Sequence, residues 1–388
     1  MEKEIVSLTR INKSHIPYLI TICLFILSEY CPLFQVLDSL HLKHLLVIMI
    51  IGLYYFRNHM LNPSTEMKFC LCTASVLYGI TLICQLHQRK LMLYSIEEIY
   101  YLIIPILFVD IVYKANRGDN MDDVMSAILL SGLFSFFTTC ADKGTLSIEN
   151  FRAMFDINKL FIESESPMIE SGLSSFFVLL YIYFLYRNKY KRAVLSAFGV
   201  FLGFKRVATL YMLILTLVFR FIPKHRKVPK LIIRIAMVSF IVLPFVAELM
   251  CTDEFAMWFY QQFEIEFNKF TMTRFYIINL VIDADLPQMG LGTTTYFLES
   301  RGHDGQLNMH NDILRIYMEC GFWGSVALSV NNFKMVAKHW YSFLTMLFLM
   351  LQMFVTHCLG SGNLSIWIIA YMIIFYFNRT DSKSLDIK

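Results

Sequence analysis

The chain has 388 residues, of which 57% are hydrophobic and 16% are charged, whereas ordinary soluble domains carry roughly 25% charged residues. Its mean hydropathy is +0.54 and its formal net charge is only +4. This composition argues against a soluble globular protein, and the small charge, concentrated in short loops, argues against a nucleic-acid-binding protein. The sequence predicts an all-α polytopic membrane protein in which residues 1–388 form one integral membrane domain.

Apolar segments recur along the chain and are separated by mostly short polar connections. Runs of about 20 apolar residues match the hydrocarbon core of a bilayer, which is about 30 Å thick. The nine cysteines show no metal-ligand spacing, so they do not indicate a metal site. We expect about twelve transmembrane helices, centred on residues 16–37, 41–57, 67–86, 97–114, 121–140, 168–186, 191–204, 207–222, 231–250, 311–330, 338–358 and 364–378.

The lysines and arginines of the loops set the orientation of these helices. With an even number of spans and both termini in the cytoplasm, 22 of the 34 lysines and arginines lie on the cytoplasmic side, in agreement with the positive-inside rule. The two long connections, about 141–167 and 251–310, then face away from the cytoplasm. The second is a large extracytoplasmic loop, which we expect to carry short helices.

Lys205 and Arg206 lie between two short apolar segments. Only twelve residues separate Arg192 from Lys205, and thirteen separate Arg206 from Arg220. As a helical hairpin, each arm reaches only about 18–20 Å at 1.5 Å per residue, which places the basic pair below the outer membrane surface, in a protein cavity. Two cations held there suit an anion such as a lipid-linked diphosphate. The alternative is an ordinary tight turn whose basic side chains reach the headgroups.

The large loop contains a predicted amphipathic helix and a glycine turn. Residues 267–283 carry apolar side chains at helical spacing, so we expect one helix near the membrane surface. Arg274 projects from this helix, where its guanidinium group can bind a substrate phosphate or, alternatively, a lipid headgroup. Gly290 and Gly292 form a turn after Pro287. Because no strand precedes this turn, it does not indicate a nucleotide site.

The tenth predicted span opens with a polar motif. Asn308 or Asn311 caps a helix that begins near His310, and the positive end of the helix dipole disfavours a protonated imidazole. We therefore expect His310 to be neutral and able to accept a proton. The alternative is a histidine that only caps the helix or packs at an interface.

The same predicted helix carries three further ionisable residues. Asp312, Arg315 and Glu319 are spaced at i,i+3 and i,i+4, so they line one face. Glu319 lies about 13 Å below His310, where an unpaired carboxylate is costly. We expect Arg315 and Glu319 to neutralise each other and so to position the helix.

In this order the motifs resemble those of the O-antigen and capsule polymerases (Wzy-type), a family related to the O-antigen ligases. The resemblance covers residues 168–330 at motif level. The matching positions are Lys205-Arg206 between two mid-chain spans, Arg274, Gly290-Leu291-Gly292-Thr293, and residues 310–321, which read His-Asn-Asp-Ile-Leu-Arg-Ile-Tyr-Met-Glu-Cys-Gly.

The resemblance implies a membrane-embedded glycosyltransferase that uses neither metal nor cofactor. Such an enzyme of the bacterial cytoplasmic membrane joins undecaprenyl-diphosphate-linked oligosaccharide repeat units into O-antigen or capsular polysaccharide, in contact with membrane lipids and alongside a flippase and a chain-length regulator. His310 is then the base or acceptor-orienting group, and Lys205, Arg206 and Arg274 bind the diphosphate. The supporting residues are Asn311, Asp312, Arg315, Glu319, Gly290 and Gly292.

Three other functions remain open, namely a ligase, a flippase and a non-enzymatic transporter. An O-antigen ligase, which transfers finished polymer to a lipid A core, uses the same kind of site. A lipid-linked oligosaccharide flippase also has about twelve spans, but we expect more even loops in a flippase than the long connection 251–310. A transporter also requires ionisable residues at mid-membrane, whereas here they gather toward one face.

Overall fold

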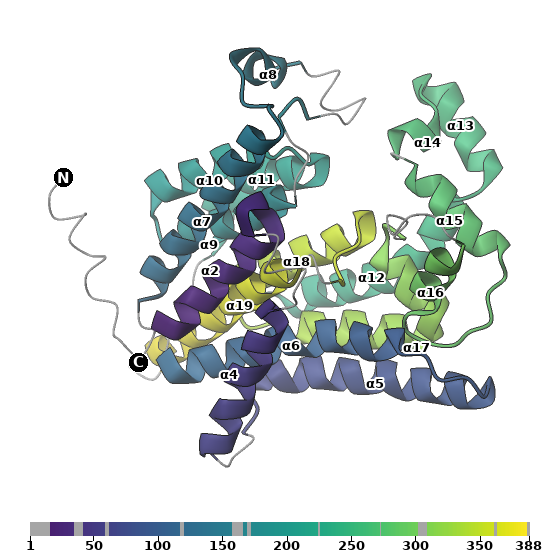
Figure 1. Ribbon diagram of the computed structural model, residues 1–388, viewed down its shortest axis with the longest axis horizontal. Coiled ribbons are helices and arrows are strands. Elements are labelled where there is room, and N and C mark those ends of the chain that lie inside the picture. The colour runs from purple at the N-terminus through teal and green to yellow at the C-terminus, as the bar shows by residue number, and fades with distance from the viewer. Residues whose placement is uncertain are drawn as a thin grey trace, which may run out of the picture.

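The protein is helical throughout the part of the chain that the structure describes (Figure 1). The structure is a computed structural model that describes residues 16–34, 42–58, 62–116, 120–156, 166–168, 172–223, 226–271, 273–301, 309–360 and 363–385. These residues form 17 α-helices and two short 3-10 helices, η3 (Pro32–Phe34) and η5 (Phe219–Phe221), and contain no strand. The predicted all-α class is therefore confirmed for the described residues.

Each of the twelve predicted spans contains one α-helix. The helices are α2 (Ile16–Tyr30), α4 (Leu42–Asn58), α5 (Thr65–His87), α6 (Tyr94–Asn116), α7 (Met121–Asp142), α9 (Leu173–Tyr186), α10 (Tyr190–Leu202), α11 (Arg206–Val218), α12 (Lys230–Met250), α17 (Asp312–Met335), α18 (Trp340–Val355) and α19 (Leu364–Leu385). The predicted break between α10 and α11 is present at residues 203–205.

Three of these helices are long and apolar enough to cross a membrane. Within the described ranges they are α5, α7 and α12, and five further apolar helical stretches of 10–17 residues are present, among them Leu364–Arg379 of α19. On α12 the exposed side chains include Ile235, Val238, Val242 and Leu249. Their spacing forms an apolar stripe along one helix face, which favours contact with hydrocarbon over contact with water.

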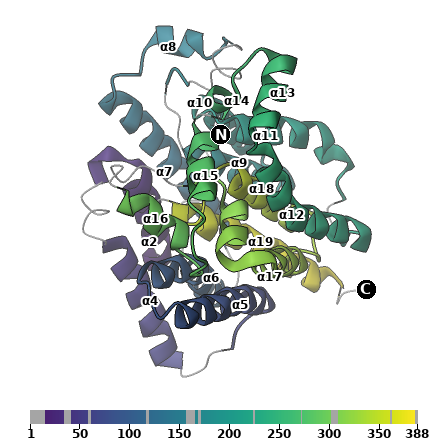
Figure 2. The same ribbon diagram turned by 90° about the vertical axis from the view of Figure 1, so that its right-hand side faces the viewer.

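The centre of the bundle is formed by helices that are apolar on all sides. Every side chain of α9 is buried, and residues 364–377 of α19 are buried as well. Figure 2 shows α9, α18 and α19 surrounded by the other helices. Rings of α9 and α19 pack together, with the Tyr186 and Phe377 centroids 4.5 Å apart. A helix without a polar face belongs to the interior of a bundle. The buried helix α9 therefore serves as the core against which the surrounding helices pack.

One end of the bundle gathers the predicted cytoplasmic connections. Arg187, just after α9, donates from Nε to Asp122 Oδ1 of α7 at 2.9 Å. Asn378 of α19 donates to Glu66 Oε1 of α5 at 3.0 Å and to the Met335 carbonyl at the end of α17 at 3.1 Å. The starts of α5 and α7 therefore meet the ends of α9, α17 and α19.

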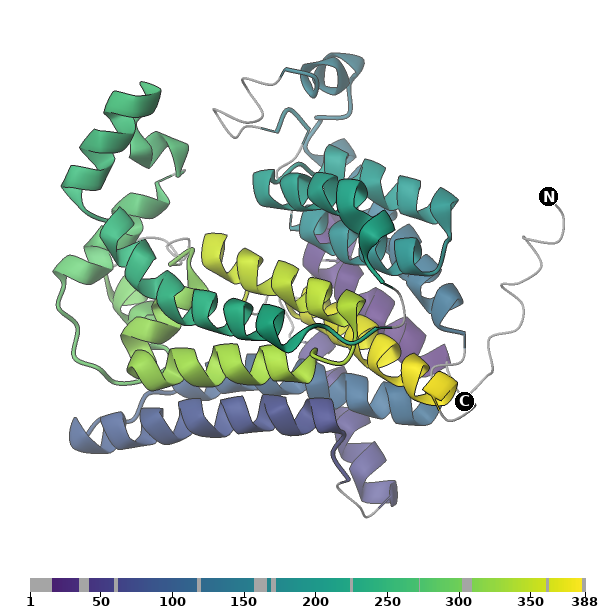
Figure 3. The ribbon, with the colours of Figure 1, turned by 180° about the vertical axis from the view of Figure 1, so that it is seen from behind.

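The opposite end of the bundle gathers the other helix termini. Glu29, near the end of α2, hydrogen-bonds Ser365 at the start of α19. His357, after α18, lies 2.8 Å from Asp312 at the start of α17. Figure 3 shows α5, α12 and α17 running side by side toward this end. The consecutive helices α17, α18 and α19 thus alternate in direction.

The described residues of the segment 251–310 form short helices at this second end (Figures 1 and 3). They are α13 (Asp253–Phe263), α14 (Phe267–Phe270), α15 (Arg274–Asp283) and α16 (Thr293–Ser300), and the other long connection carries α8 (Ile148–Ala153). The prediction of one helix over residues 267–283 was wrong, because the chain breaks between α14 and α15.

Polar side chains account for this break. Thr273 adopts a left-handed conformation with φ of +63°. The Thr271 hydroxyl accepts from the Phe275 amide, and the Asn268 side chain accepts from the Tyr276 amide, both at 3.3 Å. Such side-chain bonds to nearby amides compete with continuous helix. As a result Arg274 is the first residue of a helix instead of a residue on the face of a longer one.

Candidate functional site

The four basic and imidazole residues predicted from the sequence line one cavity. The cavity has a volume of about 310 Å³ and lies among α11, α12, α15, α18 and the residues before α17. Its lining includes Lys205, Arg206, Arg274, His310 and Asn311. These residues come from three segments that lie far apart in the sequence.

Three helices begin at this cavity. Lys205 precedes α11 and Arg206 is its first residue, Arg274 is the first residue of α15, and Asn311 caps α17. The first turn of a helix has amide groups without intrahelical partners and carries the positive end of the helix dipole. The helix starts and the basic side chains therefore add to the same positive potential.

Both guanidinium groups are oriented by backbone carbonyls. Arg206 donates from Nη2 to the Phe270 carbonyl at 2.7 Å, and its guanidinium carbon lies 4.6 Å from the centre of the Phe270 ring. Arg274 donates from Nη1 to the Val355 carbonyl at 2.7 Å. These contacts connect the 251–310 segment to α11 and α18 across the cavity.

His310 lies in the wall of this cavity as a neutral imidazole. Burial lowers the pKa of His310 from its usual value to about 4, and the positive charges of Arg274 and Lys205 act in the same direction. Its Nδ1 is buried and has no hydrogen-bond partner among the described residues. A neutral imidazole nitrogen without a partner can accept a hydrogen bond or a proton.

The start of α17 has the predicted cap. The Asn311 side chain accepts from the Leu314 amide at 3.0 Å, which confirms Asn311 as the N-cap. Asn308, the other residue that we considered, lies outside the described residues. His310 directly precedes this cap and therefore lies at the start of α17.

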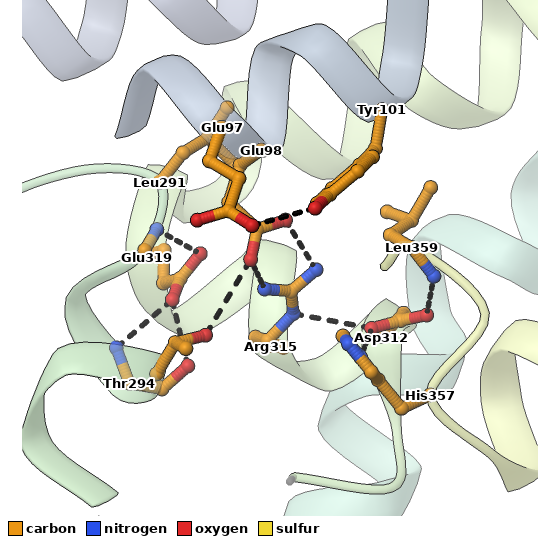
Figure 4. A network of polar contacts seen from close by, with 12 residues as sticks. Glu97, Glu98, Tyr101, Leu291, Thr294, Asp312, Arg315, Glu319, His357 and Leu359 are labelled. Carbon is orange, nitrogen blue, oxygen red and sulfur yellow. Dashed lines mark hydrogen bonds and ion pairs between the residues drawn. The ribbon is translucent and has the colours of Figure 1, made fainter. Parts of the chain in front are cut away.

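Arg315 belongs to a buried ion network beside the cavity (Figure 4). Its side chain is 1% exposed. It donates from Nη2 to Glu98 Oε2 at 2.9 Å and from Nε to Asp312 Oδ1 at 3.1 Å. The i,i+3 spacing thus brings Asp312 next to Arg315 on one face of α17.

The direct partner expected for Arg315 was Glu319, and the structure corrects this. Glu319 accepts from the Gly292 amide at 3.1 Å and from the Thr294 amide and hydroxyl at 2.9 and 2.7 Å. Glu98 takes its place, because it lies near the start of α6 and presents its carboxylate to the guanidinium group (Figure 4). The Glu319 carboxylate instead holds the start of α16.

The two glycines of the predicted turn pack against α5 and α6. Gly290 and Gly292 have φ of +82° and +85°. A Cβ atom at Gly290 would lie 2.5 Å from the Thr81 Cα, and one at Gly292 would lie 2.8 Å from the Tyr94 Cβ. Neither glycine lines the cavity, so both contribute to packing and to the Glu319 contact.

The sequence did not lead us to predict two residues of this region, Glu98 and His357. Glu98 follows Glu97 at the start of an apolar span, and ionisable residues at such a position were the criterion that selected residues 310–319. His357 is the one histidine, and there is no Asp, Glu, Lys or Arg, between Trp340 and Asn378. No group of three or more His, Cys, Asp or Glu residues suited to a metal ion occurs among the described residues.

Together these features define an all-α protein with helices that suit a membrane and a basic cavity containing a neutral imidazole. No protein-family model, curated protein or solved structure matches the chain.

Proposed function

We propose that this protein is a membrane-embedded glycosyltransferase that polymerises undecaprenyl-diphosphate-linked oligosaccharide repeat units. The single observation that carries the proposal is the meeting of Lys205, Arg206, Arg274 and His310 around one cavity. Three basic side chains and three helix starts suit a diphosphate. A neutral imidazole beside them suits a hydroxyl group that must lose a proton.

The chemistry follows from this arrangement. The hydroxyl oxygen of the acceptor sugar attacks C1 of the donor sugar, and the bond from C1 to the phosphate oxygen breaks. The electron pair leaves with the diphosphate, whose negative charge Lys205, Arg206 and Arg274 stabilise. His310 accepts the hydrogen bond of the attacking hydroxyl and takes up its proton as the bond to C1 forms. Asn311, Asp312, Arg315 and Glu319 keep the start of α17 in place.

The membrane arrangement is part of the same proposal. Twelve helices span the bacterial cytoplasmic membrane with both termini in the cytoplasm, and the cavity opens to the outer face. The up-and-down order of the helices supports this, since the connection that holds Arg187 lies at the end away from the 251–310 segment. A chain-length regulator and a flippase are the expected partners.

The test begins with deletion of the gene and sizing of the lipid-linked glycan. Accumulation of single repeat units supports the polymerase. Unattached long polymer would instead indicate a ligase, and repeat units that stay on the cytoplasmic side would indicate a flippase.

The second step returns His310→Ala to the deletion strain. We expect a drop in polymer of at least about 100-fold, the usual loss when an acid–base group is removed, with the protein still inserted in the membrane. His87→Ala is the matched control, because His87 is exposed at the end of α5 and does not line the cavity. Full-length polymer with His310→Ala would remove His310 from the site.

A further inference from the structure

One buried side chain in the wall of the basic cavity has an amide group without a partner. Gln352, in the last turn of α18, lines the cavity and is only 1% exposed. Its Nε2 has no hydrogen-bond partner among the described residues. Buried polar groups are nearly always paired with protein, water or a ligand. This amide therefore needs an acceptor that the described part of the chain does not supply.

The opposite end of the same amide is held in place by α9. The Ser175 hydroxyl donates to Gln352 Oε1 at 3.0 Å, and Ser175 is buried as well. α9 packs against α18, and none of its residues lines the cavity. Because the amide is planar and its oxygen is engaged with α9, Nε2 is directed away from the hydroxyl, with two N–H groups to donate. The side chain is thus oriented before any ligand binds.

Gln352 shares a helix face with the residue that holds Arg274. Gln352, Val355 and Thr356 are spaced at i, i+3 and i+4, which places them on one side of α18. All three line the cavity. The Val355 carbonyl accepts from Arg274 Nη1 at 2.7 Å. The end of α18 therefore brings an amide donor to the side of the cavity on which Arg274 is held.

The other polar groups of the cavity indicate what kind of acceptor fits. Lys205, Arg206 and Arg274 line it, and three helices start at it. Cations and helix starts attract an anion, and a phosphate has enough oxygens to accept from several donors at once. A neutral amide beside these cations adds a directed hydrogen bond without adding charge. An anion with several oxygens, such as a diphosphate, therefore satisfies the amide and the cations together.

We propose that Gln352 binds the diphosphate of the lipid-linked substrate, with Nε2 donating to a phosphate oxygen, and that Ser175 is the positioning residue that orients it. This inference rests on the proposed function, in which Lys205, Arg206 and Arg274 bind the same group. The three cations attract the diphosphate from several sides, whereas the amide donates along one direction and fixes where one phosphate oxygen lies. No proton is transferred to Gln352, and no covalent bond to it forms.

The first measurement is the binding of inorganic pyrophosphate to the purified full-length protein in detergent, by titration calorimetry at fixed ionic strength. Gln352→Met keeps an unbranched side chain of similar length and removes the donor. We expect an affinity at least about 10-fold weaker, the usual effect of losing a hydrogen bond to a charged group. Gln288→Met is the matched control with unchanged affinity, because Gln288 is exposed and does not line this cavity.

Gln352→Glu separates a phosphate ligand from a hydroxyl ligand. The carboxylate has the same shape and still accepts from Ser175, but it carries a negative charge in place of the donor. It repels a phosphate, so pyrophosphate should bind at least about 100-fold more weakly than to the wild type. A sugar hydroxyl, in contrast, can donate to a carboxylate, so a hydroxyl site would tolerate glutamate better than methionine.

The transferase assay supplies a readout that packing alone does not change. The KM for the lipid-linked donor should rise in the order wild type, Gln352→Met, Gln352→Glu. In Gln352→Met the kcat should stay nearly unchanged, because the hydrogen bond is made both before and during the reaction. Ser175→Ala allows the amide to rotate but keeps the donor, so its loss of pyrophosphate affinity should be less than about 10-fold.

Three results overturn the inference. Gln352→Met that binds pyrophosphate as tightly as the wild type would assign the amide to a water molecule. Gln352→Glu with a KM closer to the wild type than that of Gln352→Met would assign it to a hydroxyl. Equal losses of affinity in both variants, with lower melting temperatures of both, would assign Gln352 to packing. A wild-type protein that does not bind pyrophosphate is a separate outcome, because the diphosphate site and the proposed function then fail together with the inference.

Discussion

Arg315 carries a charge that water does not reach. Its guanidinium group contacts Glu98 and Asp312, and all three side chains are at least nine-tenths buried. Transfer of charges to such a place costs several kcal/mol per ion, which the mutual attraction must offset. The network therefore fixes the start of α6 relative to α17, because a shift of either helix leaves a buried charge without its partner.

We predict unequal effects when this network is cut in different ways. Arg315→Met leaves two carboxylates without their cation and should destabilise the protein by about 3–5 kcal/mol. The double variant Arg315→Met with Glu98→Met should recover a large part of that loss, because one of the uncompensated charges is removed as well. The measurement is unfolding of the purified protein in detergent.

Arg187→Met serves as the comparison, because the Arg187 side chain is 37% exposed in its pair with Asp122. Solvent screens this pair, so a smaller loss is expected. Equal losses for Arg315→Met and Arg187→Met would contradict the idea that burial gives the network its importance.

At the scale of single elements, local sequence predicts helices better than it predicts their breaks. The hairpin of α10 and α11 follows from the basic pair between two short apolar arms. The break before Arg274 does not, because apolar spacing continues through residues 267–283 while Asn268 and Thr271 turn their side chains onto the backbone. Apolar periodicity indicates which face of a helix is apolar. It does not indicate where polar side chains compete with the helix for backbone amides.

The glycine turn before α16 gives a prediction for one element. Gly292→Ala places a Cβ against Tyr94 and forces an L-residue into φ of +85°, which costs about 1–2 kcal/mol for the conformation alone. The amide that donates to Glu319 is displaced as well, so α16 should loosen. We expect a lower melting temperature and faster proteolysis within residues 284–301.

Gly79→Ala is the matched control within α5. A Cβ at Gly79 meets nothing within 4 Å, and alanine favours a helix over glycine by about 1 kcal/mol. This variant should melt at the same or a higher temperature. A Gly292→Ala protein that is as stable as Gly79→Ala would show that the turn tolerates a side chain.

At the scale of the whole molecule, the order of helices was predictable and their polar partners were not. A helix that crosses hydrocarbon must be a long apolar segment, so the positions of apolar segments along the sequence predict where the helices lie. The contact between Arg315 and Glu98 joins residues 217 positions apart, and no local spacing rule reaches that far. The cavity residues were selected because each basic or imidazole group lies next to an apolar segment, where charge is costly.

The same reasoning gives a prediction about the orientation of the molecule. If the basic connections are cytoplasmic, position 189 after α9 faces the cytoplasm and position 262 on α13 faces outward. Both are exposed in the structure. We expect a membrane-impermeant thiol reagent to label Gln262→Cys in intact cells, and to label Lys189→Cys only after permeabilisation.

The parent protein provides the background for this experiment, because its nine cysteines are free and Cys72 alone among them is exposed. Cys72 lies on α5, one of the candidate spans, where lipid protects it from a water-soluble reagent. Labelling of Lys189→Cys in intact cells would invert the arrangement. The basic cavity would then open to the cytoplasm, where a polymerase of exported glycans has no acceptor, and the proposed reaction would lose its substrate.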